Sequence, residues 1–168
     1  AVRQHVGDEI YSIDDYRRRY AQYKSDAQLQ AAHAACAFAT TFDDHEIDNN
    51  FAGDIDQDGS SPEVFALRRF GGLQAWYENM PVRRSAFPSL ANGLTAYRRL
   101  QWGSLLRTHV LDTRSYRSDQ PCHDGKRGPC RWEARHPPQM PASTQQSWLA
   151  RGLATPSRWH LPAHPAIP

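Results

Sequence analysis

The sequence predicts a domain of mixed α/β class, because segments with helical periodicity alternate with short apolar segments typical of strands. Its 168 residues lie in the size range of one domain, and a hydrophobic content of 39% argues against intrinsic disorder. The net charge is +2, and the arginines are spread along the chain, so nothing indicates nucleic-acid binding. No segment approaches the roughly 20 apolar residues that span a bilayer, and we expect no membrane span.

Residues 13–35 are predicted to form one amphipathic helix. Apolar residues recur there at alternating steps of three and four, at Ile13, Tyr16, Tyr20, Tyr23 and Ala27. Ser12 suits the N-cap position, and Asp15 completes a pattern close to a capping box. The helix should therefore begin sharply after Ser12.

A second helix is predicted from Ser61 to about Met80. Ser61 suits the N-cap, Pro62 suits the first helical position, and Pro81 cannot continue the helix. The pair Gly71-Gly72 weakens its middle by about 1 kcal/mol per glycine relative to alanine. A further helix is predicted over residues 143–153.

Three segments are predicted as strands. Residues 36–42 are apolar and β-branched, which predicts a buried strand. Residues 94–102 and 105–112 are separated by Gly103-Ser104, a typical hairpin turn. Residues 159–168 are rich in proline, and we expect no regular element in them.

The three cysteines fall into two groups. Cys122 and Cys130 flank a short loop of Gly, Pro, Lys and Arg, a spacing that suits a disulfide in an oxidising compartment or leaves two free thiols. Cys36 lies among alanines and is expected to pack as a small apolar residue.

The densest polar cluster directly follows the first predicted strand. It consists of Asp43, Asp44, His45 and Glu46. Carboxylates suit hard metal ions, and a neighbouring histidine can protonate a leaving group, so the cluster could serve phosphoryl transfer. The alternative is that these residues only cap the next element.

Several longer blocks resemble the alkaline phosphatase D (PhoD-like) family, and they occur in that family's order. They are DYRRRYAQYK (residues 15–24), LQAAH (29–33), TFDDHEIDNNFA (41–52), WYENMPVR (76–83), YRRLQWG (97–103) and HVLDTRSYRSDQPC (109–122). The resemblance covers about residues 2–153. It implies that residues 1–153 are an internal part of the family's catalytic domain, and that residues 154–168 are a divergent proline-rich tail.

The resemblance implies a calcineurin-like metallophosphatase fold, a β-sandwich flanked by helices that is incomplete in this chain. It implies metal-dependent hydrolysis of phosphate esters, both monoesters and diesters, with calcium and iron as cofactors. It also implies a periplasmic or extracellular location and a phosphate-ester substrate.

Individual site residues follow from the same blocks. Asp44 takes the place of a metal-ligating Asn of the wider superfamily, and His45 takes that of the histidine beside the phosphate and leaving group. Asp43 either orients a metal ligand or caps the loop. Arg114 either clamps a phosphate oxygen or forms a salt bridge with Asp112 or Asp119. Asn49 and Asn50 are expected to fix the loop rather than to contact metal.

The family's other metal-binding blocks have no counterpart before Ala1 or after Leu153. A metal cluster without those ligands would bind weakly, because each ligand comes from a different strand of one core. Whether this chain is itself an enzyme therefore stays open, and the alternative is a truncated, catalytically inactive homologue or fragment.

Two further patterns are weaker metal candidates. Residues 54–59 match the first half of an EF-hand loop, but the twelfth position is Phe65 rather than a carboxylate, so a polar surface loop is the better interpretation. His160 and His164 are four residues apart, yet Pro162 and Pro165 prevent the helix that would direct both at one ion.

Overall fold

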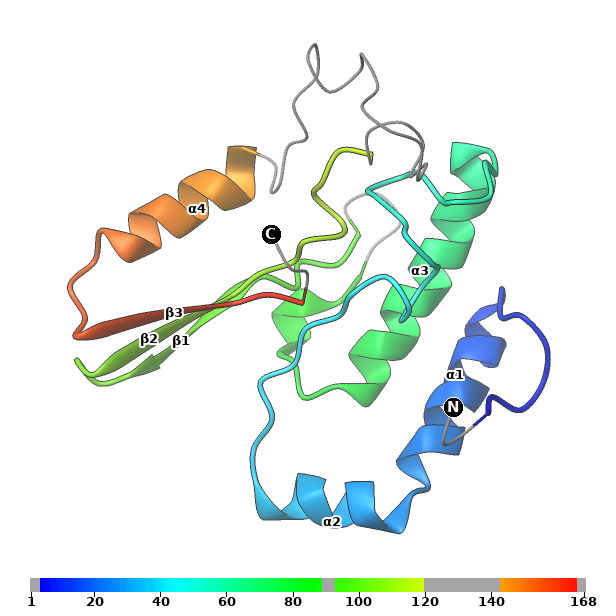
Figure 1. Ribbon diagram of the computed structural model, residues 1–168, viewed down its shortest axis with the longest axis horizontal. Helices are drawn as coiled ribbons and strands as arrows, with labels where there is room; N and C mark the ends of the chain where they lie inside the picture. Colours follow the sequence, from blue (N-terminus) through cyan, green and yellow to red (C-terminus); the bar gives the residue numbers. More distant parts are fainter. Residues whose placement is uncertain (1–3, 89–92, 120–142, 166–168) are drawn as a thin grey trace, which may run out of the picture.

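Residues 4–88, 93–119 and 143–165 are described by a computed structural model, and all statements below concern these residues. Cys122 and Cys130, expected to form either a disulfide or two free thiols, lie outside them. Helices α1, α2 and α3 lie on one side of the molecule, and a three-stranded sheet covered by helix α4 lies on the other (Figure 1). The mixed α/β class predicted from the sequence is confirmed.

The first helical segment is two helices, not one. Helix α1 spans Ile13–Lys24 and α2 spans Ala27–Ala35. The capping box predicted at Ser12 and Asp15 is present. The single-helix prediction is wrong because Asp26 turns out of the helix and caps α2, its carboxylate accepting a hydrogen bond from Leu29 N at 2.8 Å.

The strand predicted over residues 36–42 is absent. This segment is extended but pairs with no strand among the described residues, and most of it is exposed. Cys36 is an exposed free thiol, so the expectation that it packs inside is wrong. Two hydrogen bonds connect the end of the segment to β1 and to the residue after β2. Arg98 Nη2 donates to Thr40 O (2.6 Å), and Thr41 Oγ1 donates to Leu111 O (2.8 Å).

Helix α3, Pro62–Asn79, has the predicted limits, although the Ser61 side chain makes no capping bond. Its two glycines allow close approach of neighbouring segments. A Cβ at Gly72 would lie 3.2 Å from Ile47 Cγ1 and 3.3 Å from the Tyr16 ring. The glycine pair was predicted to weaken the helix locally. Because these residues have no side chain, α1 and the 43–50 loop can pack tightly against α3.

The sheet has the order β1-β2-β3. Strands β1 (Arg98–Trp102) and β2 (Leu106–Val110) form the predicted hairpin, shorter than expected, and Gly103 supplies the positive φ of +54° in its turn. Strand β3 (Trp159–Ala163) pairs parallel with β2, so the expectation that residues 159–168 form no regular element is wrong. Pro162 is tolerated because β3 is an edge strand.

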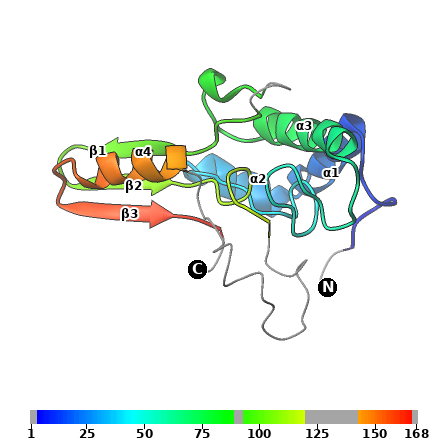
Figure 2. The ribbon, with the colours of Figure 1, turned by 90° about the horizontal axis from the view of Figure 1, so that it is seen from above.

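Helix α4, Ser143–Leu153, has the predicted limits and lies along one face of the sheet (Figures 1 and 2). The Arg99 guanidinium stacks 4.1 Å above the Trp148 ring, and Arg107 donates to Gly152 O at 3.2 Å. Arg99 Nη2 also donates to Trp148 O. Of these two cations, Arg107 meets a carbonyl group in the last turn of α4, where positive charge stabilises a helix. One further short element is the 3-10 helix η1, Arg84–Ala86.

The apolar core lies between α3, residues 42–51 and the chain leading into β1. Its buried members are Phe42, Ile47, Phe51, Phe65, Leu73, Trp76, Leu94 and Ala96. Phe42 and Trp76 meet edge to face with ring centroids 5.3 Å apart. This cluster fixes the position of residue 42, from which the candidate loop departs.

Gly152→Ala should destabilise the protein although alanine favours helix. Its Cβ would lie 2.5 Å from Arg99 Nε and 2.6 Å from His109 Cε1; the His109 ring is fully buried, and the Arg99 guanidinium is stacked on Trp148. We expect a loss of about 1 to 3 kcal/mol in the free energy of unfolding measured in urea. Arg151→Ala on the exposed side of α4 is the control and should leave the midpoint nearly unchanged; equal stability of the glycine variant would contradict the packing.

Candidate active site

The candidate site is the loop of residues 43–50, which folds around the carboxylate and carbonyl of Asp44. Asp44 O accepts hydrogen bonds from Ile47 N and Asp48 N, both at 2.8 Å. Asp44 Oδ2 accepts from Asn50 N at 2.8 Å, and Asn50 has a positive φ of 56°. Asparagine tolerates this conformation better than most residues, so the choice of residue at position 50 matches the loop.

Arg114 reaches this loop from the segment after β2, about 70 residues later in the sequence. Its Nε lies 2.5 Å from Asp43 Oδ1 and its Nη2 lies 3.2 Å from Asp44 Oδ1. The Arg114 and Asp44 side chains are each only 9% exposed, so this is a largely buried pair. The structure thus joins Arg114 to Asp43 and Asp44, whereas Asp112 accepts from the backbone of Arg114 (N to Oδ1, 3.1 Å).

Asp44 is held in its charged form. Burial alone would raise its pKa, but the hydrogen bond from Asn50 N and the charge of Arg114 outweigh burial and lower the pKa of Asp44 below its ordinary value. The carboxylate is therefore ionised at neutral pH. The ionised carboxylate of Asp44 thus lies next to His45.

His45 is the exposed member of the cluster. Its side chain is 77% exposed, and its Nε2 lies 2.9 Å from Asn49 Oδ1 and 3.5 Å from Asp44 Oδ2. The ring lines a hollow of about 360 Å³ together with Arg19, Asn49, Gln57 and Asp58. An accessible imidazole between fixed polar groups can donate a proton to a bound molecule or accept a hydrogen bond from it.

A second buried arginine holds the far end of the loop. Arg68 of α3 is 8% exposed, and its Nη1 lies 3.1 Å from Asp48 Oδ1, with Asp48 also 8% exposed. Arg68 Nε donates to Tyr16 Oη at 3.3 Å, and Tyr16 Oη donates in turn to Ile47 O at 2.5 Å. Arg114 at one end and Arg68 at the other thus fix the loop that carries His45.

Sequence reasoning missed Arg68, Tyr16 and Asp48 as support for the site. One signal was present, since Arg68 lies between Phe65 and Gly72 on the buried face of α3. Charged residues on such a face are almost always paired. The partner could not be named, because Asp48 lies outside the helix and its approach depends on tertiary packing.

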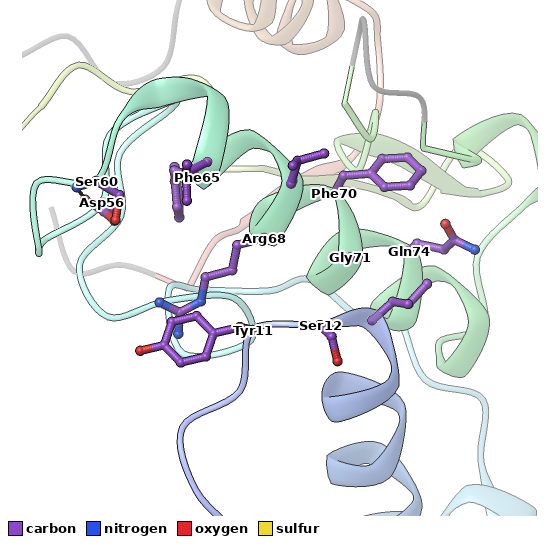
Figure 3. Close-up of a pocket in the computed structure, with 12 residues that line it drawn as sticks. Tyr11, Ser12, Asp56, Ser60, Phe65, Arg68, Phe70, Gly71 and Gln74 are labelled. Carbon is purple, nitrogen blue, oxygen red and sulfur yellow. Dashed lines mark hydrogen bonds between the residues drawn. The ribbon is translucent and has the colours of Figure 1, made fainter.

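A pocket of about 520 Å³ lies between the start of α1 and α3, next to this support rather than at His45. Figure 3 shows Arg68 extending toward the Tyr11 ring, whose centroid is 4.5 Å from the guanidinium carbon. The pocket lining contains none of Asp43, Asp44, His45 or Arg114. It is therefore separate from the candidate site.

The described residues do not fit a metal cluster on their own. Among them, no group of three or more His, Cys, Asp or Glu side chains is arranged to hold a metal ion. Asp44 binds Arg114 and Asn50 N, and Asp43 binds Arg114. Calcium and iron sites need more ligands than these two carboxylates.

The two weaker metal patterns have other contacts. Asp54 pairs with Arg69 at 2.6 Å, and Asp56 Oδ1 accepts from Gly59 N at 2.7 Å and Ser60 N at 2.9 Å. His160 Nδ1 lies 3.1 Å from His109 Nε2 on the neighbouring strand. The acidic residues therefore shape a polar loop, and the histidine packs within the sheet.

Arg68→Met should destabilise the protein strongly. It leaves Asp48 buried without its cation, which typically costs about 3 to 5 kcal/mol. The free energy of unfolding in urea measures this, with Arg18→Met as a matched control because Arg18 pairs with Asp15 at the surface. A loss no larger than that of the control would show that the Asp48 pair does not hold the loop.

Asp112 should make stability fall as pH rises. The residue is 0% exposed, and burial raises its pKa despite hydrogen bonds from Ser115 and Arg114. Above the ordinary pKa near 3.8 the unfolded chain releases this proton while the native chain retains it, so the native state loses stability.

Replacing Asp112 by Asn removes this titration. The stability of Asp112→Asn relative to the parent, measured by urea unfolding, should therefore grow as pH rises above the ordinary pKa of 3.8. Asp14→Asn, an exposed change on α1, is the control. Parallel pH profiles for parent and Asp112→Asn would contradict the role of burial.

Comparison with known proteins supports the resemblance seen in the sequence. The family described as PhoD-like phosphatase matches residues 1–167. Alkaline phosphatase D of Bacillus subtilis (strain 168) is 43% identical over 162 residues, which are 95% of this chain and 27% of that protein. A solved structure described as "Structure of PhoD" is similar with a TM-score of 0.90 at 41% identity, covering 97% of this chain and 31% of that one.

The chain thus spans about a third or less of the length of these relatives. Within the described residues, no helix has both the length and the apolarity to cross a membrane. The match is nevertheless continuous along nearly the whole chain, and the predicted blocks lie within it. This chain belongs to the PhoD-like phosphatase family.

Proposed function

We propose that this chain forms part of a phosphoric ester hydrolase, a phosphatase or phosphodiesterase that requires metal ions. The observation that carries the proposal is the 43–50 loop, which presents the exposed His45 beside the anchored carboxylate Asp44. Membership of the PhoD-like phosphatase family supports it. The substrate is then a phosphate ester.

His45 is assigned the chemical role. Ester hydrolysis releases an alkoxide, and protonation of that oxygen by a positioned imidazole typically speeds such a step by about 10² to 10⁴. His45 is accessible to a substrate, while its neighbours Asp44 and Asn49 are fixed by the loop. The same ring can alternatively donate a hydrogen bond to a phosphate oxygen.

Arg114 is assigned an indirect role. Its Nε and Nη2 contact Asp43 and Asp44, and its Nη1 is buried. A direct clamp on phosphate would require the guanidinium to leave both carboxylates. We therefore assign Arg114 to positioning these two residues and keep the phosphate clamp as the alternative.

Calcium and iron remain the cofactors that the family resemblance implies. Asp44, with Asp43 beside it, is the residue of this chain assigned to metal binding, but further ligands would have to come from outside the described residues. Metal content of the purified chain tests this assignment, because it requires no catalytic turnover. A periplasmic or extracellular location is proposed on the same family basis.

A second candidate is a catalytically inactive homologue or fragment. The observation in its favour is that the described residues include no metal-holding group of three or more ligands. On this view the loop is preserved as structure, and no ester is hydrolysed.

Hydrolysis of p-nitrophenyl phosphate and of its bis-ester, with calcium and iron supplied, separates the two candidates. An active chain should lose about 10² to 10⁴ in rate with His45→Asn, because the proton donor is gone. His33→Asn is the matched control, since His33 is an exposed histidine on α2. Asp44→Ala should abolish the response to added metal.

Each outcome decides between the candidates. Activity that survives in His45→Asn would exclude the role assigned to this residue. No hydrolysis of either ester by the parent would favour the inactive homologue.

A further inference from the structure

The end of the sheet that contains the hairpin turn carries exposed apolar side chains on neighbouring strands. We call this end the sheet tip; its exposed apolar residues are Trp102, Leu105, Trp159 and Leu161, each between 51% and 63% exposed. Trp102 and Trp159 lie on either side of Leu106, in register across the three strands. Leu105 O accepts a hydrogen bond from Trp159 N at 2.9 Å. These residues are therefore neighbours in one apolar patch.

The strand residues of the patch lie on the face of the sheet that α4 does not cover. Arg99 and His109 point toward α4, because the guanidinium and the imidazole both contact Trp148, and His160 bonds to His109 on the same face. Successive residues of a strand point to opposite faces, so Trp102 and the two patch residues of β3 point away from α4. Figures 1 and 2 show the sheet tip at the end of the molecule far from α1 and α3.

The segments that form the sheet and α4 are basic throughout. Residues 93–111 and 143–165 contain five arginines and no Asp or Glu. Residues 4–88, which form α1, α2, α3 and the 43–50 loop, contain fourteen Asp and Glu against eight Lys and Arg. The two sides of the molecule therefore carry opposite net charge, and the sheet tip belongs to the positive side.

Three of these arginines lie close to the patch. Arg158 directly precedes β3, and its N donates to Ser104 O in the hairpin turn at 2.9 Å. Arg107 donates to Gly152 O, a neutral acceptor that does not cancel its charge. Arg151 precedes that glycine, and both Arg151 and Arg158 are exposed. The patch therefore combines apolar surface with positive charge.

We propose that the sheet tip docks on an anionic lipid bilayer, with its tryptophans and leucines at the level of the headgroups and the adjacent arginines against lipid phosphates. Tryptophan is enriched at membrane interfaces, and each arginine near an anionic surface adds to binding. Arginine can bury its aliphatic stem while its charge stays in water. The acidic residues of the helical side lie away from such a surface, so their repulsion is weakened by distance and by salt.

Two other occupants fit the patch less well. A second copy docked through the same patch would bring two identical groups of arginines together, and like charges oppose such an interface. Single-stranded nucleic acid stacks its bases on aromatic rings, but Leu105 and Leu161 offer no ring. A bilayer accepts both aliphatic and aromatic side chains and supplies the negative charge. The composition of the patch therefore favours a lipid surface.

Flotation with lipid vesicles tests the proposal without requiring ester hydrolysis. Vesicles of phosphatidylcholine with about 30% phosphatidylglycerol are compared with vesicles of phosphatidylcholine alone. At about 0.1 M NaCl we expect the partition coefficient to be at least about tenfold higher for the anionic vesicles. This advantage should shrink at about 0.5 M NaCl, because salt screens the arginines.

Substitutions separate the contribution of charge from that of apolar contact. Arg158→Gln should lower the partition coefficient about fivefold, whereas Arg84→Gln, at an exposed arginine of η1, should leave it unchanged. Trp159→Ser should lower it about tenfold or more, because less apolar surface leaves water on docking. Leu67→Ser is the matched control, since Leu67 on α3 is 66% exposed and lies outside the patch.

Vesicles with brominated acyl chains report insertion directly, because bromine quenches the fluorescence of tryptophan only at short range. The parent chain should be quenched by anionic brominated vesicles. The double variant Trp102→Phe and Trp159→Phe retains aromatic rings and should still float with the vesicles, but most of the quenching should disappear. Urea unfolding of each variant identifies those that remain folded.

The proposal is overturned if the chain floats equally well with both kinds of vesicle, floats with neither, or floats undiminished as folded Trp159→Ser. Should Trp159→Ser fail to fold, undiminished flotation of Leu105→Ser, a change in the exposed turn, would overturn it instead. A dimer in sedimentation velocity, or binding of a single-stranded oligonucleotide, in place of vesicle binding would assign the patch to another occupant. In a longer protein that contains this chain, protection of Trp102 and Trp159 from acrylamide quenching without vesicles would also overturn it, because another segment would then cover the patch.

Discussion

The candidate site depends on two buried arginines that pair with carboxylates, one at each end of an eight-residue loop. Arg114 holds Asp43 and Asp44 where the loop begins, and Arg68 holds Asp48 near its end. A carboxylate removed from water is tolerated only when it is paired and hydrogen-bonded. The ion pairs therefore favour this arrangement of the loop, in which the side chain of His45 is exposed.

Local signals in the sequence predicted the features that short segments determine by themselves. Ser12 and Asp15 cap α1, Pro62 begins α3, and Gly103 turns the hairpin. The polar cluster after residue 42 and Arg114 were named as candidate site residues from expected strand ends and from the family resemblance, and these assignments stay predictions. What the sequence did not predict was that these groups bind each other.

Two of the errors, those at residues 36–42 and 159–168, have a common physical origin in contacts between distant segments. Strand β3 forms because its backbone pairs with β2, about 50 residues away, and an edge position accepts Pro162. Residues 36–42 have the composition of a buried strand but find no pairing partner among the described residues. The break between α1 and α2 is different, since Asp26 was visible as a potential cap and periodicity was given too much weight.

The pairing of Asp44 with Arg114 also bears on metal binding. An ionised carboxylate offers about four lone-pair positions, so bonds to Arg114 and Asn50 N do not use up the acceptor capacity of Asp44. They do place a positive charge beside it, which weakens attraction for a cation. Further anionic ligands would have to offset that charge. The proposed metal binding at Asp44 therefore depends on how many further carboxylates lie around it, whereas the contact of His45 Nε2 with Asn49 Oδ1, at 2.9 Å, is formed within the loop itself.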